Sequence, residues 1–268
     1  APHVPRSQQM ADFSSRIRPI AGGKFEASGV VQVNGTNGFL FVDDSRTRVV
    51  LWLELTSTGG QNGAPVPIPL GTEIVDPEGM TTDGKYTYIV GSQSKSRGLA
   101  GIGLMRFVYD PQRRMIQSIE SIRELKAFLA RGLVELRNAE INIEGLTWDP
   151  RQNRLLLGLR APLNNGQALL IPLKLRKPDG PFATDNITVE PPLTLQLDGA
   201  GIRSIEYDSS RNGFLVIAGP SQDKEDREFR LLLWSGMTSP DPLPPAIVQF
   251  ANNLKPEGVT SATLQGSE

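Results

Sequence analysis

Five glutamates recur along the chain, each at or near the start of a short stretch with strand-like composition. Three of them are followed directly by glycine and an apolar residue, as in Glu144-Gly145-Leu146. Intervals of 52, 66, 62 and 51 residues separate the five, and such intervals are typical of β-propeller blades with loop insertions. The innermost strand of each blade lines the propeller axis, so these side chains are predicted to form a ring of carboxylates. The five are Glu26, Glu78, Glu144, Glu206 and Glu257.

The negative charge of such a ring must be compensated, because carboxylates that converge within a few ångströms cannot otherwise all stay ionised. One form of compensation is a Ca²⁺ or Mg²⁺ ion bound by the five glutamates, with Asn142, Asn252 and Asn253 adding neutral oxygens; hard oxygen ligands suit these ions better than copper or zinc. A second is pairing with cations such as Arg203 and Lys255. A third is a purely structural use, in which each glutamate accepts backbone hydrogen bonds and aligns neighbouring blades. The sequence leaves all three open.

The metal hypothesis leads to a hydrolase of phosphoesters or lactones, in which the ion polarises the substrate and activates water. Glu144 or Glu78 would then serve as general base. Basic residues expected near one face of the disc would bind an anionic ligand; they are Lys95, Arg160, Arg203 and Lys255. The alternative is a non-catalytic propeller scaffold that binds a protein or a small anionic ligand. No organic cofactor is expected.

The segments between the glutamates have the pattern of a four-stranded meander. Turn signals such as Asp83-Gly84 and Asp149-Pro150 separate short apolar runs. We therefore expect an all-β fold, a single five-bladed β-propeller domain over residues 1–268, with blades starting near 26, 78, 144, 206 and 257. The last blade would be incomplete, because the sequence ends at Glu268; a C-terminus cut short is favoured, with Arg16–Ile20 as a strand that helps close the ring.

One segment breaks the strand pattern. Apolar residues at helical spacing, after the capping box Ser121-x-x-Glu124, predict an inserted helix near 121–131. Trp52, Trp148 and Trp234 fall in or at the ends of predicted strands and are expected to pack between blades.

The composition excludes several classes of function. Lys plus Arg number 28 against 29 Asp plus Glu, so there is no basic surplus for binding nucleic acid. Cysteine is absent and His3 is the only histidine, which removes thiolate nucleophiles, the usual triads and His- or Cys-ligated metals. The longest apolar runs are strand-sized, so no membrane span is expected. The first residues, Ala-Pro-His-Val-Pro, suit a processed periplasmic or secreted protein, although a cytoplasmic location stays open.

Three runs carry a resemblance to known proteins: 144–150 (EGLTWDP), 201–207 (GIRSIEY) and 255–260 (KPEGVT). Over most of residues 24–262 the chain resembles an uncharacterised bacterial β-propeller family, common in cyanobacteria and proteobacteria and catalogued as a domain of unknown function. It is also distantly similar to phytase-like esterase propellers, which carry similar Glu-Gly strand starts. The resemblance implies the propeller fold and supplies no catalytic residues. Ala27 and Tyr207 stand where the pattern has glycine, which implies different spacing of those two blades at the axis.

Overall fold

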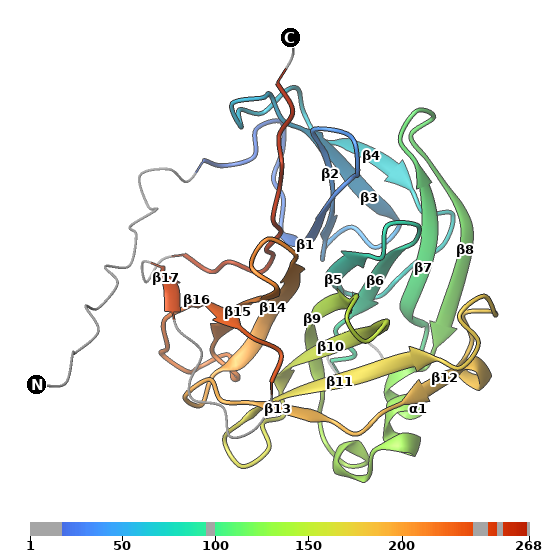
Figure 1. Ribbon diagram of the computed structural model, residues 1–268, viewed down its shortest axis with the longest axis vertical. Coiled ribbons are helices and arrows are strands. Elements are labelled where there is room, and N and C mark those ends of the chain that lie inside the picture. Colours follow the sequence, from blue (N-terminus) through green and yellow to red (C-terminus); the bar gives the residue numbers. More distant parts are fainter. Residues whose placement is uncertain (1–17, 95–99, 238–245, 251–253, 267–268) are drawn as a thin grey trace, which may run out of the picture.

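The computed structural model describes residues 18–94, 100–237, 246–250 and 254–266. These residues form four antiparallel sheets that radiate from a common axis, as Figure 1 shows. The innermost strands of the sheets, β1, β5, β9 and β14, pack against one another in chain order around that axis. An all-β propeller arrangement is thus confirmed.

Three of the blades are four-stranded meanders, and the third blade has five strands. The first blade contains β1 (Ala27–Gln32), β2 (Gly38–Asp43), β3 (Val49–Glu54) and β4 (Val66–Pro69). The second contains β5 (Pro77–Thr82), β6 (Thr87–Gly91), β7 (Ile102–Asp110) and β8 (Met115–Arg123). The third contains β9 (Asn142–Asp149), β10 (Arg154–Ala161), β11 (Ala168–Leu175), β12 (Ile187–Val189) and β13 (Leu193–Leu195). The fourth contains β14 (Gly201–Asp208), β15 (Gly213–Gly219), β16 (Arg230–Trp234) and β17 (Ala246–Gln249).

The prediction of five blades is wrong for the described part of the chain, which holds four. Residues 254–266 run as an extended segment, without assigned strand pairing, beside the first blade. Side chains hold this segment in place: Gln32 bonds both backbone groups of Thr263, and Asn37 does the same for Gln265, at 2.7–3.0 Å. Residues 18–20 of the predicted closing strand are not in a strand, and Arg16 and Ile17 lie outside the described residues.

Hydrophobic burial between neighbouring sheets holds the blades together. Three clusters of buried side chains occupy the joints between the first and second, second and third, and third and fourth blades. Strands such as β2 and β15 are buried along their whole length, because both faces of a central blade strand meet a neighbouring sheet. Apolar surface buried in this way stabilises the fold by about 25 cal/mol per Å².

The inserted helix is confirmed, but it begins later than predicted. α1 spans Leu125–Gly132, and residues 121–123 belong to β8. Glu124 has a left-handed backbone, with φ of 52°, and makes no capping hydrogen bond with its side chain. The Ser121-x-x-Glu124 pattern is therefore not a capping box, because β8 pairs with β7 as far as Arg123. No helix in the described ranges has the length and hydrophobicity needed to cross a membrane.

An aspartate ends or directly follows three of the innermost strands. The carboxylates of Asp83, Asp149 and Asp208 each accept a hydrogen bond from the backbone N–H two residues later, at 2.9, 3.1 and 2.9 Å. This local bond forms a tight turn. The three turns thereby provide a common reference point for comparing positions in different blades.

Candidate functional site

The same position of each innermost strand carries a β-bulge. Strand pairing shifts at Glu78, Glu144 and Arg203, each of which lies five residues before a turn aspartate. The pairing of β1 shifts over Ser28 and Gly29. A bulge re-aims the side chain that it carries and is frequent beside functional sites. The equivalent residues around the axis are therefore Ser28, Glu78, Glu144 and Arg203.

Glycines confirm this alignment at the crowded axis. A Cβ on Gly79 would lie 2.8 Å from that of Leu146, and a Cβ on Gly29 only 2.4 Å from the Met80 nitrogen. A Cβ on Gly258 would lie even closer to the Ser28 carbonyl oxygen. This contact places Glu257, the residue before Gly258, as the fifth member of the series. Glycine after Glu78, Glu144 and Glu257 in the sequence predicts such close approach at the axis, and the contacts of Gly79, Gly145 and Gly258 confirm it.

Glu206 does not belong to this ring; it lies three residues further along its strand, at the level of Thr81 and Thr147. Both threonine hydroxyls lie at hydrogen-bond distance from Glu206 Oε1, at 3.5 and 3.4 Å. Glu206 Oε2 is buried and has no hydrogen-bond partner among the described residues. Burial raises the pKa of Glu206 well above its usual value, although the threonine hydroxyls and the Tyr207 N–H partly offset this. The predicted blade start near 206 is five residues late, because β14 begins at Gly201.

Glu26 precedes the ring position by two residues and is exposed. Asp76 and Asn142 hold the equivalent places before Glu78 and Glu144, on the same face of the propeller; Asp76 directly precedes β5 and Asn142 begins β9. Asn252 and Asn253 lie outside the described residues. Asn142 Oδ1 is buried without a hydrogen-bond partner in the part of the chain described here.

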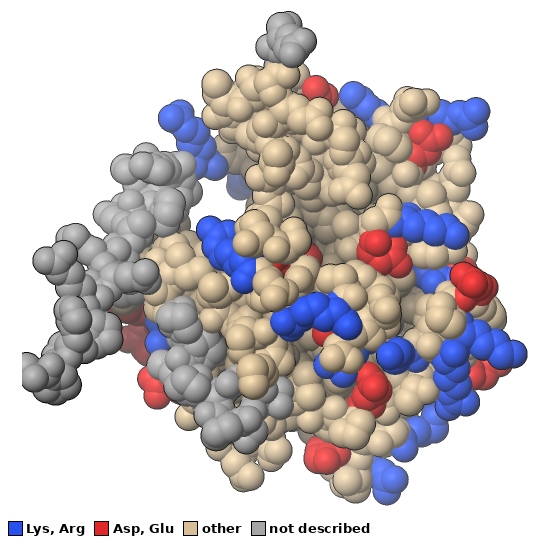
Figure 2. Space-filling model, in the orientation of Figure 1, with Lys and Arg blue, Asp and Glu red and all other residues tan. Residues whose placement is uncertain are grey.

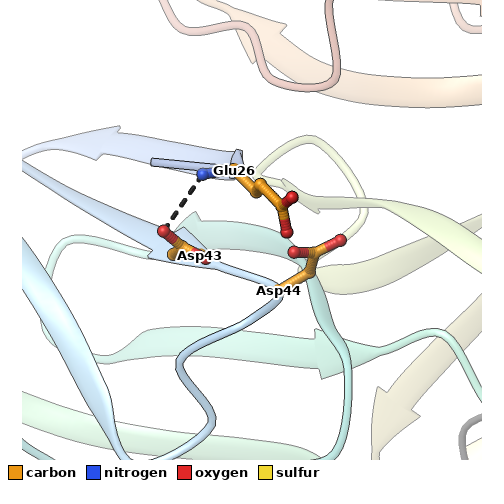
Figure 3. A group of neighbouring side chains, drawn as sticks. All are labelled: Glu26, Asp43 and Asp44. Atoms are coloured by element: carbon orange, nitrogen blue, oxygen red, sulfur yellow. Dashed lines mark hydrogen bonds between the residues drawn. The ribbon is translucent and has the colours of Figure 1, made fainter. Parts of the chain in front are cut away.

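Carboxylates converge where the first two blades meet on this face. We call Glu26, Asp43, Asp44, Asp76 and Glu78 the carboxylate cluster. Ligand oxygens of Asp44, Asp76 and Glu78 lie within 4.8 Å of one another, as do those of Glu26, Asp43 and Asp44. In Figure 3 the carboxylates of Glu26 and Asp44 face each other, whereas Asp43 turns toward the Glu26 backbone N–H and accepts a hydrogen bond from it at 3.1 Å.

The members of the cluster differ in how far they are neutralised. The Asp43 carboxylate accepts hydrogen bonds from the Ser45 backbone N–H and hydroxyl and lies near Arg46, so its role is structural. Glu78 is 9% exposed and has no hydrogen bond or ion pair to another described residue. Burial, followed by the charge of Glu144 and other acids, raises the pKa of Glu78 to about 9. Burial and Glu26 raise the pKa of Asp44 to about 7.

Arginines neutralise the other side of the same face. Arg203 Nε donates to Glu144 Oε2 at 2.5 Å, and Arg203 Nη2 lies 3.3 Å from Glu257 Oε1. Arg160 approaches the other Glu144 oxygen at 3.2 Å and Asp223 at 2.7 Å. We call Glu144, Arg160, Arg203 and Glu257 the arginine network.

A cavity of about 460 Å³ adjoins the arginine network and is lined by both Arg160 and Arg203, with Lys255 and Glu257. Its remaining charged walls include four acidic residues, and Arg227 there is paired with Glu225 at 2.6 Å. Figure 2 likewise shows blue and red side chains interspersed near the centre of the face in view. The predicted cation-lined site is thus balanced in charge. Lys95 lies outside the described residues.

Three members of the carboxylate cluster, Asp43, Asp44 and Asp76, were missed by the sequence analysis. Counting back from the turn aspartates would have separated Arg203 from Glu206 and aligned Asp76 with Asn142. Asp44 had no such signal, because it lies in the β2–β3 turn and reaches the axis only through the folding of the first blade.

The fold and the axial site define a β-propeller with an acidic site on one face of its axis. The sequence model of a family described as "Protein of unknown function (DUF3616)" matches residues 108–246, from the second to the fourth blade. The chain belongs to this family.

Three solved structures are similar to this chain over most of its length. A protein of unknown function from Bacteroides thetaiotaomicron VPI-5482 is 13% identical, with a TM-score of 0.40, covering 81% of this chain and 43% of that one. A luciferin-regenerating enzyme is 11% identical, with a TM-score of 0.38, covering 79% of this chain and 60% of that one. A "putative 6-phosphogluconolactonase" from Bacteroides fragilis NCTC 9343 is 13% identical, with a TM-score of 0.40, covering 83% of this chain and 56% of that one. The chain spans about half the length of these proteins. No curated protein matches the sequence.

Proposed function

We propose that this protein is a divalent-metal-dependent hydrolase of a phosphoester or lactone, with its metal site at Asp44, Asp76 and Glu78. One observation carries the proposal: three carboxylate oxygens lie within 4.8 Å of one another, and the Glu78 side chain among them is buried without a hydrogen-bond partner in the described structure. A buried carboxylate without a partner costs several kcal/mol unless a proton or a cation compensates it.

The donor set suits Ca²⁺ or Mg²⁺. All candidate ligands are oxygens, and the orphaned Asn142 Oδ1 on the same face supplies a neutral one. When bound there, the ion would polarise a phosphoryl or carbonyl oxygen and lower the pKa of a bound water. Of the five glutamates predicted as ligands, we retain Glu78 and, at the rim, Glu26. Glu144 and Glu257 are held by arginines, and Glu206 lies at a different level.

We assign the role of general base to Glu257 rather than to Glu144 or Glu78. The Glu257 side chain is 30% exposed, lines the cavity and has a pKa raised mainly by burial and Glu144, which brings it closer to neutral. Glu144 is held by Arg160 and Arg203 and positions Arg203. Lys255, which lines the same cavity, would bind the anionic group of the substrate.

A second candidate function is a non-catalytic module that binds a protein or a small anionic ligand on this face. The pairing of Glu144 with two arginines favours it, because such a network rigidifies a surface without leaving a free catalytic carboxylate. A periplasmic or secreted location remains a prediction under either function.

Thermal melting with and without Ca²⁺ or Mg²⁺ tests the metal site. An ion at about 100 times its Kd would stabilise the protein by about 2.7 kcal/mol, or about 5 to 10 °C in Tm for a domain of this size. Asp44→Asn should abolish the shift, whereas Asp179→Asn, on an exposed loop of the third blade, should retain it. Absence of a shift with either ion in the parent protein would contradict the metal site.

Hydrolysis distinguishes the two functions. We expect metal-dependent cleavage of p-nitrophenyl phosphate, bis-p-nitrophenyl phosphate or a δ-lactone, lost in Glu257→Gln with the melting shift retained. A melting shift without cleavage of any of these would favour the binding module.

A further inference from the structure

A second cavity, of about 450 Å³, lies between the second and third blades, remote from the axial site. It opens beside Asp83 and Asn153, in the turns that follow β5 and β9. Glu78 and Glu144 lie at the other ends of those strands. Five residues of extended strand separate Glu78 from Asp83, about 16 Å. The cavity is therefore separate from the proposed metal site.

Aromatic rings form one wall of this cavity. The rings of Tyr88 and Trp148 are parallel within 2°, with centroids 6.3 Å apart, and Phe182 meets Tyr88 edge-on at 5.7 Å. Leucines of β10 and β11, together with Pro178 and Ile187, form the rest of the aliphatic lining. Trp52 and Trp234 are buried, as the sequence predicted, but Trp148 is only half-buried because it faces this cavity.

Most of the charged groups at this cavity are already engaged. Asp83 accepts hydrogen bonds from two backbone N–H groups and from the Tyr88 hydroxyl. Arg106 donates to Glu120 at 2.6 Å and lies 4.0 Å from the centroid of the Tyr86 ring. The Lys174 side chain is exposed at the rim, and its ammonium group has no ion pair or hydrogen bond to any other residue that the structure describes. The free charge at this site is therefore positive.

We propose that this cavity is a binding site for a planar aromatic anion of two or three rings. Pockets of about 300 to 1,000 Å³ with apolar walls and few polar groups are typical of small-molecule sites. Aromatic walls bind a flat apolar body by stacking. The Lys174 ammonium would pair with a carboxylate or sulfonate at the cavity mouth.

Two fluorescent probes that share an aromatic body test the proposal. 8-Anilino-1-naphthalenesulfonate carries the anion, and N-phenyl-1-naphthylamine lacks it. We expect a single saturable site for the sulfonate, with at least threefold tighter binding than for the neutral amine. Lys174→Gln should remove that preference, whereas Lys224→Gln, an equal charge change on an exposed loop of the fourth blade, should not.

A filling substitution tests the location. Leu175→Phe places a larger side chain at the half-buried cavity wall and should weaken binding of the sulfonate at least tenfold, because the phenyl ring would take up space that the probe needs. Leu254→Phe, the matched change in the cavity beside Arg203, should not. Equal binding of both probes, or unchanged binding by Leu175→Phe with its melting temperature retained, would overturn the proposal. Neither outcome depends on the axial metal.

Discussion

The acidic side chains on the two sides of the axial face differ in how their negative charge is compensated. In the arginine network, Glu144 meets Arg160 and Arg203, and each charge has a partner within 3.3 Å. In the carboxylate cluster, Glu78 and Asp44 have acids as neighbours and raised pKa values. The first side is compensated within the chain, whereas on the second side burial and neighbouring acids favour the protonated forms of Glu78 and Asp44. Glu78 and Glu144, at equivalent positions of their strands, thus differ in whether an arginine compensates their charge.

The largest effect is expected from breaking the network. Arg203→Met would leave Glu144 buried and without its closest partner, and removal of one member of a buried ion pair costs about 3 to 5 kcal/mol. Arg48→Met, which breaks the exposed Arg48–Glu73 pair, should cost less than about 1 kcal/mol. Urea unfolding measures both. If the two variants lose equal stability, the arginine network is not what holds this side of the face together.

A smaller effect, with a definite sign, is expected from the pH dependence of the cluster. The pKa of Glu78 is raised on folding, so its unfolded form loses the proton first as pH rises above about 4.5, and its contribution to stability falls until about pH 9. In chelator, the parent protein should lose about 1 to 3 kcal/mol more than Glu78→Gln between pH 5 and pH 8. Asp44 contributes in the same direction to both proteins. Parallel stability curves for the two proteins would show that Glu78 titrates normally.

The smallest effect is expected from Glu206. Burial raises its pKa well above the usual value, which favours the protonated, neutral form, and Glu206→Gln keeps its shape and its threonine partners. We expect a change below about 1 kcal/mol and an unaltered response of Tm to Ca²⁺. Loss of that response would place Glu206 among the metal ligands and contradict its separation from the ring.

Repetition and turns made much of the fold predictable. Apolar runs between turn residues predict strands over 38–43 and 66–70, and β2 and β4 lie within one residue of these ranges, because such runs leave few alternatives. The pattern also predicts an outer strand over 188–197, which splits into β12 and β13, since Pro191 and Pro192 lack the N–H groups that pairing needs. The sequence analysis did not predict β8, whose last residues it assigned to the helix because Ile122 fits a helical period.

The site was harder to predict, because it depends on position across blades. Glu26 and Glu206 match the Glu pattern in sequence, but a β-bulge selects Ser28 and Arg203 as the residues facing the axis. A shift of one residue reverses the side of a strand on which a side chain lies, so composition near the strand start cannot identify the axial residue. Bulge positions depend on pairing with the second strand of each blade.

The sequence by itself determined a repeated, all-β propeller in which glycines allow close approach at the axis and glutamates such as Glu78 and Glu144 lie near the starts of innermost strands. Local turn chemistry and apolar periodicity act within a few residues, and they survive in any arrangement of the blades. Only the tertiary structure decided the number of blades among the described residues, the pairing of Glu144 with arginines from two strands, and the convergence of Asp44 with Asp76 and Glu78. Those outcomes depend on distances between residues far apart in the chain, which the order of residues alone does not specify.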